Sequence, residues 1–282
     1  MATVTEGAGP AGATGAASTG AGTPEVPDRL PILRVPRGSV SPYVLTVGDP
    51  DRAVDVGRRL DGGRELGRFR EYVTWQGRWQ GLDLTVTSHG VGGAGAAVAF
   101  EELILGGAKT IVRLGTAGSA LVDIRSGDLL IATGAIREDG VSEQLLPLSY
   151  PAISDMAVTQ ALIAAANARQ DVRFATGVVM TKAAFYPGVL PDQREIWSRT
   201  PLVGYEMELA TLLVIATIRG IRAGGVFTVD GSPGEGDPED ARVYDPHRDV
   251  VREGKERMIE VGLDAITRLA SRDASGTEGT AT

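Results

Sequence analysis

The alternation of short apolar runs with helix-like segments is the feature that most constrains this fold. The apolar runs are rich in β-branched residues, as expected for strands covered on both faces. They span residues 43–47, 82–88, 110–114, 129–133, 177–180 and 224–229. Helix-like segments span residues 51–60, 95–105, 155–169, 207–219 and about 246–270. This order predicts an α/β fold, a three-layer α/β/α sandwich with a central mixed, largely parallel sheet.

The two ends of the chain differ in composition from this alternating region. Residues 1–25 contain 7 Ala, 6 Gly and 5 Thr, and residues 273–282 are similarly poor in large apolar side chains. Such segments bury too little apolar surface to offset the entropy lost on ordering. We therefore expect two disordered tails, at 1–25 and 273–282, around one domain at 26–272.

Charge and cysteine content exclude several classes of protein. The chain has 28 basic and 36 acidic residues, so its formal net charge is −8 and a nucleic-acid partner is not expected. It has no cysteine and only two histidines, which argues against disulfides and against a structural metal site. Its longest apolar run, 210–218, is too short to cross a membrane, and its first residues do not resemble a signal peptide. We expect a cytoplasmic protein without a membrane partner.

The loops after the strands are where sites form in α/β folds. The first such loop, residues 48–52, places Gly48 before a helix that carries Arg52. Free amides at a helix start beside an arginine favour an anion. The alternative is a plain turn with Asp49 or Asp51 as the helix cap.

The glycine-rich loop at residues 89–95 fits a dinucleotide signature at Gly90, Gly92 and Gly95. That signature needs an acidic residue on the next strand, which ends instead in Arg113. The loop could alternatively approach another ligand or pack its helix closely. We expect His89 to be a packed, hydrogen-bonded histidine.

Three further pieces each allow a structural and a functional interpretation. Arg113 in an apolar strand needs either an internal carboxylate or a bound phosphate, the latter helped by Thr116. Glu206 and Glu208 could balance a helix dipole, or one of them could accept the hydroxyls of a ribose. Asp230 could shape the turn before a glycine or act in a site at the end of its strand.

Taken together, these pieces resemble the nucleoside phosphorylase-I family, which includes purine nucleoside phosphorylases and uridine phosphorylases. The resemblance is greatest to the apicomplexan-type purine enzymes, because both have a Glu-Met-Glu-Leu-Ala-Thr helix start and a Val-Asp-Gly strand end. The matching stretches follow the family's order and comprise residues 47–52, 70–72, 88–92, 100–103, 107–116, 206–211 and 229–231.

The resemblance implies roles for individual residues. Phosphate would be bound by Gly48, Arg52, Arg113 and Thr116, with Arg70 reaching in from a neighbouring subunit. The ribose would contact Met207 and Glu208, and the base would contact Phe185, Tyr186, Glu206 and Asp230. The catalytic residues would be Asp230, which assists the leaving base, and Arg113.

The implied activity is phosphorolysis of the N-glycosidic bond of a purine (deoxy)ribonucleoside, giving the free base and (deoxy)ribose 1-phosphate. Such an enzyme is a pentosyltransferase, a glycosyltransferase of nucleoside catabolism and purine salvage. Inorganic phosphate would be its co-substrate, and no cofactor or metal is expected. Shared sites imply a homo-oligomer, at least a dimer, and the family suggests a hexamer.

The sequence departs from the family in three places, and these leave alternatives open. No histidine lies near Ile32, where the family donates one to the ribose 5′-hydroxyl. Val189, Leu190 and Pro191 stand where uridine phosphorylases carry a pyrimidine-reading Gln and Arg, while Gln193 and Arg194 follow just beyond. The segment 232–247 is rich in Gly, Pro and acidic residues and is expected to be a mobile lid.

The alternatives to a purine phosphorylase are a uridine phosphorylase, a nucleosidase that uses water, a dinucleotide-binding oxidoreductase and a non-catalytic nucleoside-binding module. The nucleosidase is disfavoured because related nucleosidases lack the arginine set that Arg52, Arg70 and Arg113 complete here. The oxidoreductase depends on the glycine pattern of residues 90–95 alone.

Overall fold

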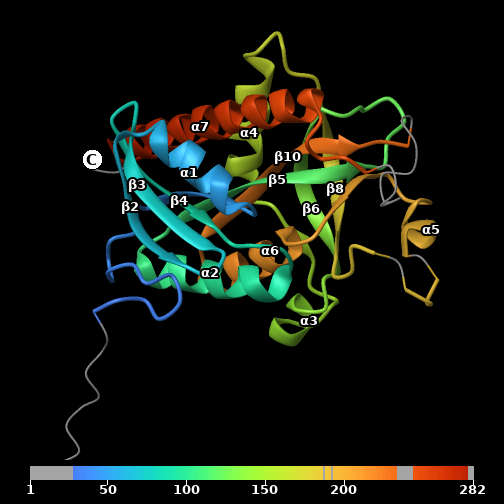
Figure 1. The fold of residues 1–282 in the computed structure, drawn as a ribbon, viewed down its shortest axis with the longest axis horizontal. Coiled ribbons are helices and arrows are strands. Elements are labelled where there is room, and N and C mark those ends of the chain that lie inside the picture. The colour runs from blue at the N-terminus through green and yellow to red at the C-terminus, as the bar shows by residue number, and fades with distance from the viewer. Residues whose placement is uncertain (1–27, 187, 192, 234–243, 279–282) are drawn as a thin grey trace, which may run out of the picture.

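The computed structural model describes residues 28–186, 188–191, 193–233 and 244–278, and Figure 1 shows their arrangement. The expected N-terminal tail at 1–25 lies outside the described residues. So do residues 234–243, which form the middle of the expected lid.

Strands and helices alternate through most of the described chain, as expected, but β2, β3 and β4 follow one another directly, and so do β5 and β6. The strands are β1 (Tyr43–Val47), β2 (Asp61–Phe69), β3 (Tyr72–Trp79), β4 (Leu82–Ser88), β5 (Thr110–Ser119), β6 (Leu129–Glu138), β7 (Ala152–Ile153), β8 (Phe174–Lys182), β9 (Leu202–Glu206) and β10 (Arg222–Gly231). The helices are α1 (Pro50–Arg58), α2 (Gly93–Gly106), α3 (Ser142–Leu145), α4 (Met156–Asn167), α5 (Gln193–Trp197), α6 (Leu209–Arg219) and α7 (Asp249–Glu278).

The strands form one mixed sheet in the order β10-β6-β8-β9-β5-β1-β4-β3-β2. Parallel pairing joins β1 to β4 and β5, β5 to β10, and β8 to β6 and β9. Because β10 pairs with both β6 and β5, the strands β5, β10, β6, β8 and β9 close into a ring. In the parallel part, Val47 pairs with Ser88 on one side and with Leu114 on the other. The loops after β1 and β4 therefore start side by side. β5 continues instead to Ser119, so residues 115–119, expected to form a loop, are part of the strand.

Helices cover both faces of the sheet (Figure 1). Val44 and Ile111 pack in one core with side chains of α2 and α6, whereas their neighbours Leu45 and Val112 pack in a second core with α1, α4 and α7. Successive residues of one strand thus enter different cores, which explains the continuous apolar runs. The expected three-layer α/β/α arrangement is confirmed.

The C-terminal helix is longer than the sequence pattern indicates. Residues 273–278, expected to belong to a disordered tail, are helical, while 279–282 lie outside the described residues. The carboxylate of Asp273 accepts hydrogen bonds from the Tyr43 hydroxyl at 2.5 Å and from Nη1 of Arg222 at 2.9 Å. These contacts attach the end of α7 to β1 and β10. Within the described part of the chain, no helix is both long and apolar enough for a membrane span.

Candidate active site

A cavity of about 610 Å³ opens where β1, β4, β5, β8, β9 and β10 end or enter their loops. Nine of the residues expected to form a site line it: Gly48, Arg52, Arg113, Thr116, Phe185, Glu206, Met207, Glu208 and Asp230. The cavity is also lined by residues to which the sequence analysis gave no role, among them Glu71, Lys182, Tyr205 and Tyr244; of these, Glu71 lies within the matching stretch 70–72.

Two expected site residues do not line the cavity. Arg70 is exposed in the turn between β2 and β3, with a positive φ of 54° and its guanidinium 5.3 Å from the ring centre of Phe69. Tyr186 is 65% exposed, although its ring contacts that of Phe185 edge-on at 5.0 Å between centroids. Phe185 is thus the aromatic residue of this pair that faces the cavity.

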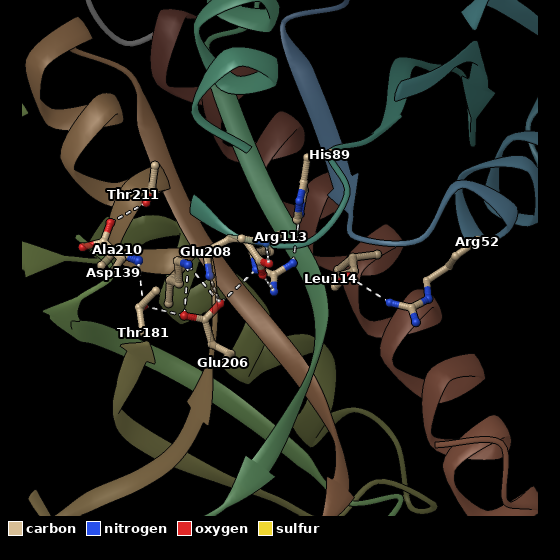
Figure 2. Close-up of polar contacts among 12 residues, drawn as sticks. Arg52, His89, Arg113, Leu114, Asp139, Thr181, Glu206, Glu208, Ala210 and Thr211 are labelled. Carbon is tan, nitrogen blue, oxygen red and sulfur yellow. Dashed lines mark hydrogen bonds and ion pairs between the residues drawn. The ribbon is translucent and has the colours of Figure 1, made fainter. Parts of the chain in front are cut away.

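The loop after β1 forms both the helix cap and the cationic edge of the cavity. The Asp49 side chain caps α1 and accepts from the Asp51 amide at 2.9 Å. One turn further along, Arg52 reaches the middle of β5, where its Nη1 donates to the carbonyl oxygen of Leu114 at 3.4 Å (Figure 2). Burial lowers the pKa of Arg52, so this cation is held in a poorly solvated place.

Arg113 is the centre of a buried polar network, as Figure 2 shows. Its Nε donates to Glu206 at 3.1 Å, its Nη2 donates to Glu208, and its Nη1 lies 2.9 Å from Nε2 of His89. The guanidinium also lies over the ring of Phe227, 5.3 Å from its centre. Of the two partners considered for Arg113, an internal carboxylate or a bound phosphate, the structure shows internal carboxylates, and there are two of them.

His89 is a packed histidine, as expected. It is fully buried, and its ring lies edge-on to Phe100 at 5.4 Å between centroids. Burial, together with the charge of Arg113, lowers the pKa of His89 well below its ordinary value. The imidazole is therefore neutral, and its Nε2 accepts the hydrogen bond from Arg113.

Glu206 uses both carboxylate oxygens inside the protein. Oε2 accepts from the amides of Glu208 and Leu209, both at 2.9 Å, in addition to Arg113, while Oε1 accepts from the Thr181 hydroxyl. A carboxylate in this position satisfies free amides at the start of α6 and opposes the helix dipole. Glu206 thereby fixes the positions of Arg113 and Glu208, and its expected contact with a base stays a prediction.

Glu208 joins the glycine-rich loop to Arg113. Its Oε1 accepts from the Gly92 amide at 2.5 Å, so this loop gives a backbone donor to a carboxylate of the same chain. Burial raises the pKa of Glu208, the neighbouring charge of Glu206 raises it further, and Arg113 lowers it. Gly92 itself has a positive φ of 92°, which a residue with a side chain rarely adopts.

Asp230 ends β10 inside the cavity and is only 6% exposed. Its Oδ2 accepts from the Tyr244 hydroxyl at 2.8 Å, and its main-chain oxygen accepts from Nη2 of Arg248 at 3.0 Å. Burial raises the pKa of Asp230, while hydrogen bonds from Tyr244 and Thr116 lower it. A carboxyl group with a raised pKa in a cleft can act as a general acid.

Comparisons with known proteins agree with the resemblance of the motifs. A family described as "Phosphorylase superfamily" matches residues 42–268. A purine nucleoside phosphorylase of Plasmodium falciparum is 37% identical over 244 residues, which cover 86% of this chain and 97% of that protein. A uridine phosphorylase of Treponema pallidum is 36% identical over 244 residues, covering 82% and 91%.

Solved structures with a similar fold are enzymes of the same two kinds, purine nucleoside phosphorylases and uridine phosphorylases. A crystal structure of a purine nucleoside phosphorylase from Toxoplasma gondii, in complex with immucillin-H, superimposes with a TM-score of 0.82. The two chains are 33% identical, and the match covers 88% of this chain and 99% of the other. The similarity therefore extends over almost the whole of the related enzymes.

Proposed function

The chain belongs to the phosphorylase superfamily, and we propose that it cleaves the N-glycosidic bond of a purine ribo- or deoxyribonucleoside with inorganic phosphate. The products are the free base and (deoxy)ribose 1-phosphate. The chain is thus an enzyme of the nucleoside phosphorylase class, a pentosyltransferase. Purine nucleoside phosphorylases are among its relatives at 37% identity, which supports this reaction.

The observation that carries the proposal is that one cavity is lined by a buried arginine, Arg113, by a partly buried arginine, Arg52, and by a buried acid, Asp230. Arg52 and Arg113 can bind an anion, and Asp230 can supply a proton. A nucleophilic dianion and an acid for the leaving group are the two requirements of phosphorolysis. A hydrolytic nucleosidase would not need the arginine set.

We assign the phosphate to the edge of the cavity formed by the loop after β1 and by β5. The amide of Gly48, the guanidinium groups of Arg52 and Arg113, and the hydroxyl of Thr116 can donate to its oxygens. Arg113 already has acceptors in Glu206 and Glu208, so its orientation is set before phosphate arrives. Such preorganised donors stabilise charge without reorganising during the reaction.

The sugar and the base occupy the rest of the cavity. Glu208 can accept hydrogen bonds from the two ribose hydroxyls, with Met207 beside the sugar. Phe185 would offer an aromatic face to the base, and Asp230 would give a proton to N7. In this arrangement the cavity would hold phosphate and nucleoside next to each other, and such positioning can supply much of the catalysis when little covalent chemistry is required.

In the chemical step the C1′–N9 bond breaks, and its electron pair goes to the purine. A phosphate oxygen forms the new bond to C1′ while Asp230 gives its proton to N7. Asp230 lies near Arg52 and Thr116, so a bound phosphate dianion is close enough to raise the pKa of Asp230 further. Bound phosphate would thus keep the carboxyl group of Asp230 protonated until the base leaves.

Uridine phosphorolysis is the second candidate, favoured by the 36% identity to a uridine phosphorylase. Against it, Val189 and Leu190 are exposed apolar residues at the positions where the resemblance to uridine phosphorylases implies a Gln and an Arg that bind the pyrimidine. Pyrimidines also have no N7 for Asp230 to protonate.

We further propose that the active enzyme is a homo-oligomer, at least a dimer and by family analogy a hexamer. Arg70 supports this, because it is exposed on the β2–β3 turn and lies outside its own chain's cavity. A neighbouring subunit is the natural place for a third phosphate ligand. A cytoplasmic location and a role in purine salvage belong to the same proposal.

The deciding experiment measures base release from inosine, guanosine, adenosine and uridine, each with and without phosphate. We expect phosphate-dependent release from at least one purine nucleoside, with formation of the sugar 1-phosphate. Release without phosphate would identify a nucleosidase instead, and release from uridine alone would identify the second candidate.

A further inference from the structure

Tyr244 connects two functional parts of the cavity. Its hydroxyl donates to Oδ2 of Asp230 at 2.8 Å. Its ring lies 5.5 Å from the ring of Phe185, tilted by 57°. All three side chains line the same cavity. Tyr244 is therefore in contact both with the acid and with the aromatic side chain assigned to the base.

The segment that carries Tyr244 is also bound to the main chain next to this acid. Nη2 of Arg248 donates to the carbonyl oxygen of Asp230 at 3.0 Å and to Oγ of Ser126 at 2.6 Å. Nε of Arg248 donates to the carbonyl of Asp245 at 3.2 Å. Residues 244–248 thus hold both the backbone and the side chain of Asp230.

The direction of the Tyr244–Asp230 hydrogen bond follows from the electrostatics. Burial and the adjacent charge of Asp230 both raise the pKa of Tyr244, so the phenol keeps its proton and acts as the donor. The accepting oxygen is Oδ2. In the protonated form of Asp230, the oxygen that accepts from a phenol is the carbonyl-type oxygen, and the proton then resides on Oδ1.

We propose that Tyr244 is a positioning residue that directs the acidic proton of Asp230, on Oδ1, toward the leaving base. The inference rests on the proposed function, in which Asp230 protonates a purine. When Oδ1 releases its proton to the purine nitrogen, Asp230 becomes a carboxylate that still accepts from Tyr244. A hydrogen bond to a charged acceptor is stronger than one to a neutral acceptor. Tyr244 therefore stabilises the transition state more than the ground state.

Other groups face Asp230 from the elements packed around it. Thr116 of β5 donates to it, and the cations of Lys255 on α7 and Arg52 on α1 act on it through space. Burial raises the pKa of Asp230. The hydrogen bond from Tyr244 lowers this pKa more than any other group does. Removing the phenol hydroxyl therefore raises the pKa of Asp230 and moves the basic limb of the turnover profile to higher pH.

The test compares Tyr244→Phe with Tyr150→Phe, which removes a hydroxyl from a half-exposed ring outside the cavity. Turnover of inosine is measured from pH 5 to 10, beside turnover of N7-methylguanosine. The methylated purine already carries a positive charge and needs no proton at N7. For Tyr244→Phe we expect about a tenfold lower kcat on inosine, the loss of one hydrogen bond to a charged group.

We also expect the basic limb of that variant to move upward by about one pH unit. Its turnover of N7-methylguanosine and that of Tyr150→Phe on both substrates should stay within about twofold of wild type. Equal losses on the two substrates, or an unshifted pH profile, would overturn the role of Tyr244. Absence of phosphate-dependent turnover in the wild type would instead overturn the proposed function.

Discussion

Nε of Arg113 donates to Oε2 of Glu206 at 3.1 Å, and the two side chains are only 4% and 0% exposed. Buried charges are costly unless each finds enough partners. Here Glu206 also accepts from the Thr181 hydroxyl and the first amides of α6, while Arg113 also reaches Glu208 and His89. These partners hold the guanidinium of Arg113 in a fixed orientation beside the proposed phosphate site.

The first prediction follows for Glu206→Gln. Gln is neutral, so Arg113 loses a charged partner. Its NH₂ group would also replace one of the two oxygens that now accept from Arg113, from Thr181 and from the first amides of α6. Removing one partner of a buried pair costs about 3–5 kcal/mol. Urea unfolding should show a loss of this order, whereas Glu101→Gln, which breaks an exposed pair with Arg219, should cost under about 1 kcal/mol. Equal effects of the two substitutions would contradict this account of the network.

The second prediction concerns Arg113→Ala. We expect a higher phosphate KM and a lower kcat, because a charge-assisted contact to a dianion in a closed site contributes on the order of 2–4 kcal/mol. Phosphate should raise the melting temperature of the wild type by mass action and do so less in the variant. The exposed Arg219→Ala is the control. If phosphate changes neither melting nor rate of the wild type, the phosphorylase assignment fails.

The third prediction tests the shared site through Arg70 and Glu208. If Arg70 serves the phosphate of a neighbour, Arg70→Ala and Glu208→Ala inactivate different halves of one composite site. Mixing the two inactive proteins under conditions of subunit exchange should restore part of the activity in hybrid sites. Exchange demonstrated by mass spectrometry without any recovery would mean that each chain has a complete site.

The buried parallel strands could be predicted from sequence more accurately than the rest of the fold. The bounds of β1 and β4 match the expected 43–47 and 82–88, because most residues of both strands are buried, whichever face of the sheet they are on. β2 was not predicted, since it is mostly exposed and contains Gly62, Gly63 and Gly67. β3 was not predicted either, although its first three residues are buried, so the whole antiparallel edge of the sheet was missed.

Candidate site residues could be predicted where a charged residue interrupts an apolar strand. Arg113 and Asp230 are charged residues in apolar strands, and that contrast made them candidates. Tyr244 gives no such signal, because it follows a polar segment and meets Asp230 only through the folded chain. Glu71 and Lys182 likewise reach the cavity only because the fold brings distant segments of the chain together.

The fourth prediction is a pH dependence of stability caused by Asp230. Burial raises the pKa of Asp230 above the ordinary 3.8, so the folded state prefers the protonated acid. The stability that this preference contributes is complete below pH 3.8 and is lost as pH rises through the folded-state pKa. Asp230→Asn has no charge to bury and should be more stable than wild type at pH 7, with a smaller difference near pH 4. Urea unfolding across this range measures it, and a difference that grows toward low pH would contradict the sign.

The last prediction uses the same substitution to separate a catalytic Asp230 from one that only shapes a turn. A purine leaves with negative charge on its five-membered ring, and N7 is the atom that a carboxylic acid can neutralise. Asp230→Asn keeps the size of the side chain and can still accept from Tyr244, but it has no acidic proton to transfer.

Loss of general-acid assistance typically costs about 10²–10⁴-fold, and we expect inosine or guanosine turnover to fall by that factor. The phosphate KM should not rise, because the substitution removes a negative charge near the proposed phosphate site. If Asp230 only forms the turn before Gly231, Asn adopts the same turn and turnover should be nearly normal. Near-normal purine turnover by a well-folded Asp230→Asn protein would therefore exclude Asp230 as the acid, and the raised pKa would reflect burial alone.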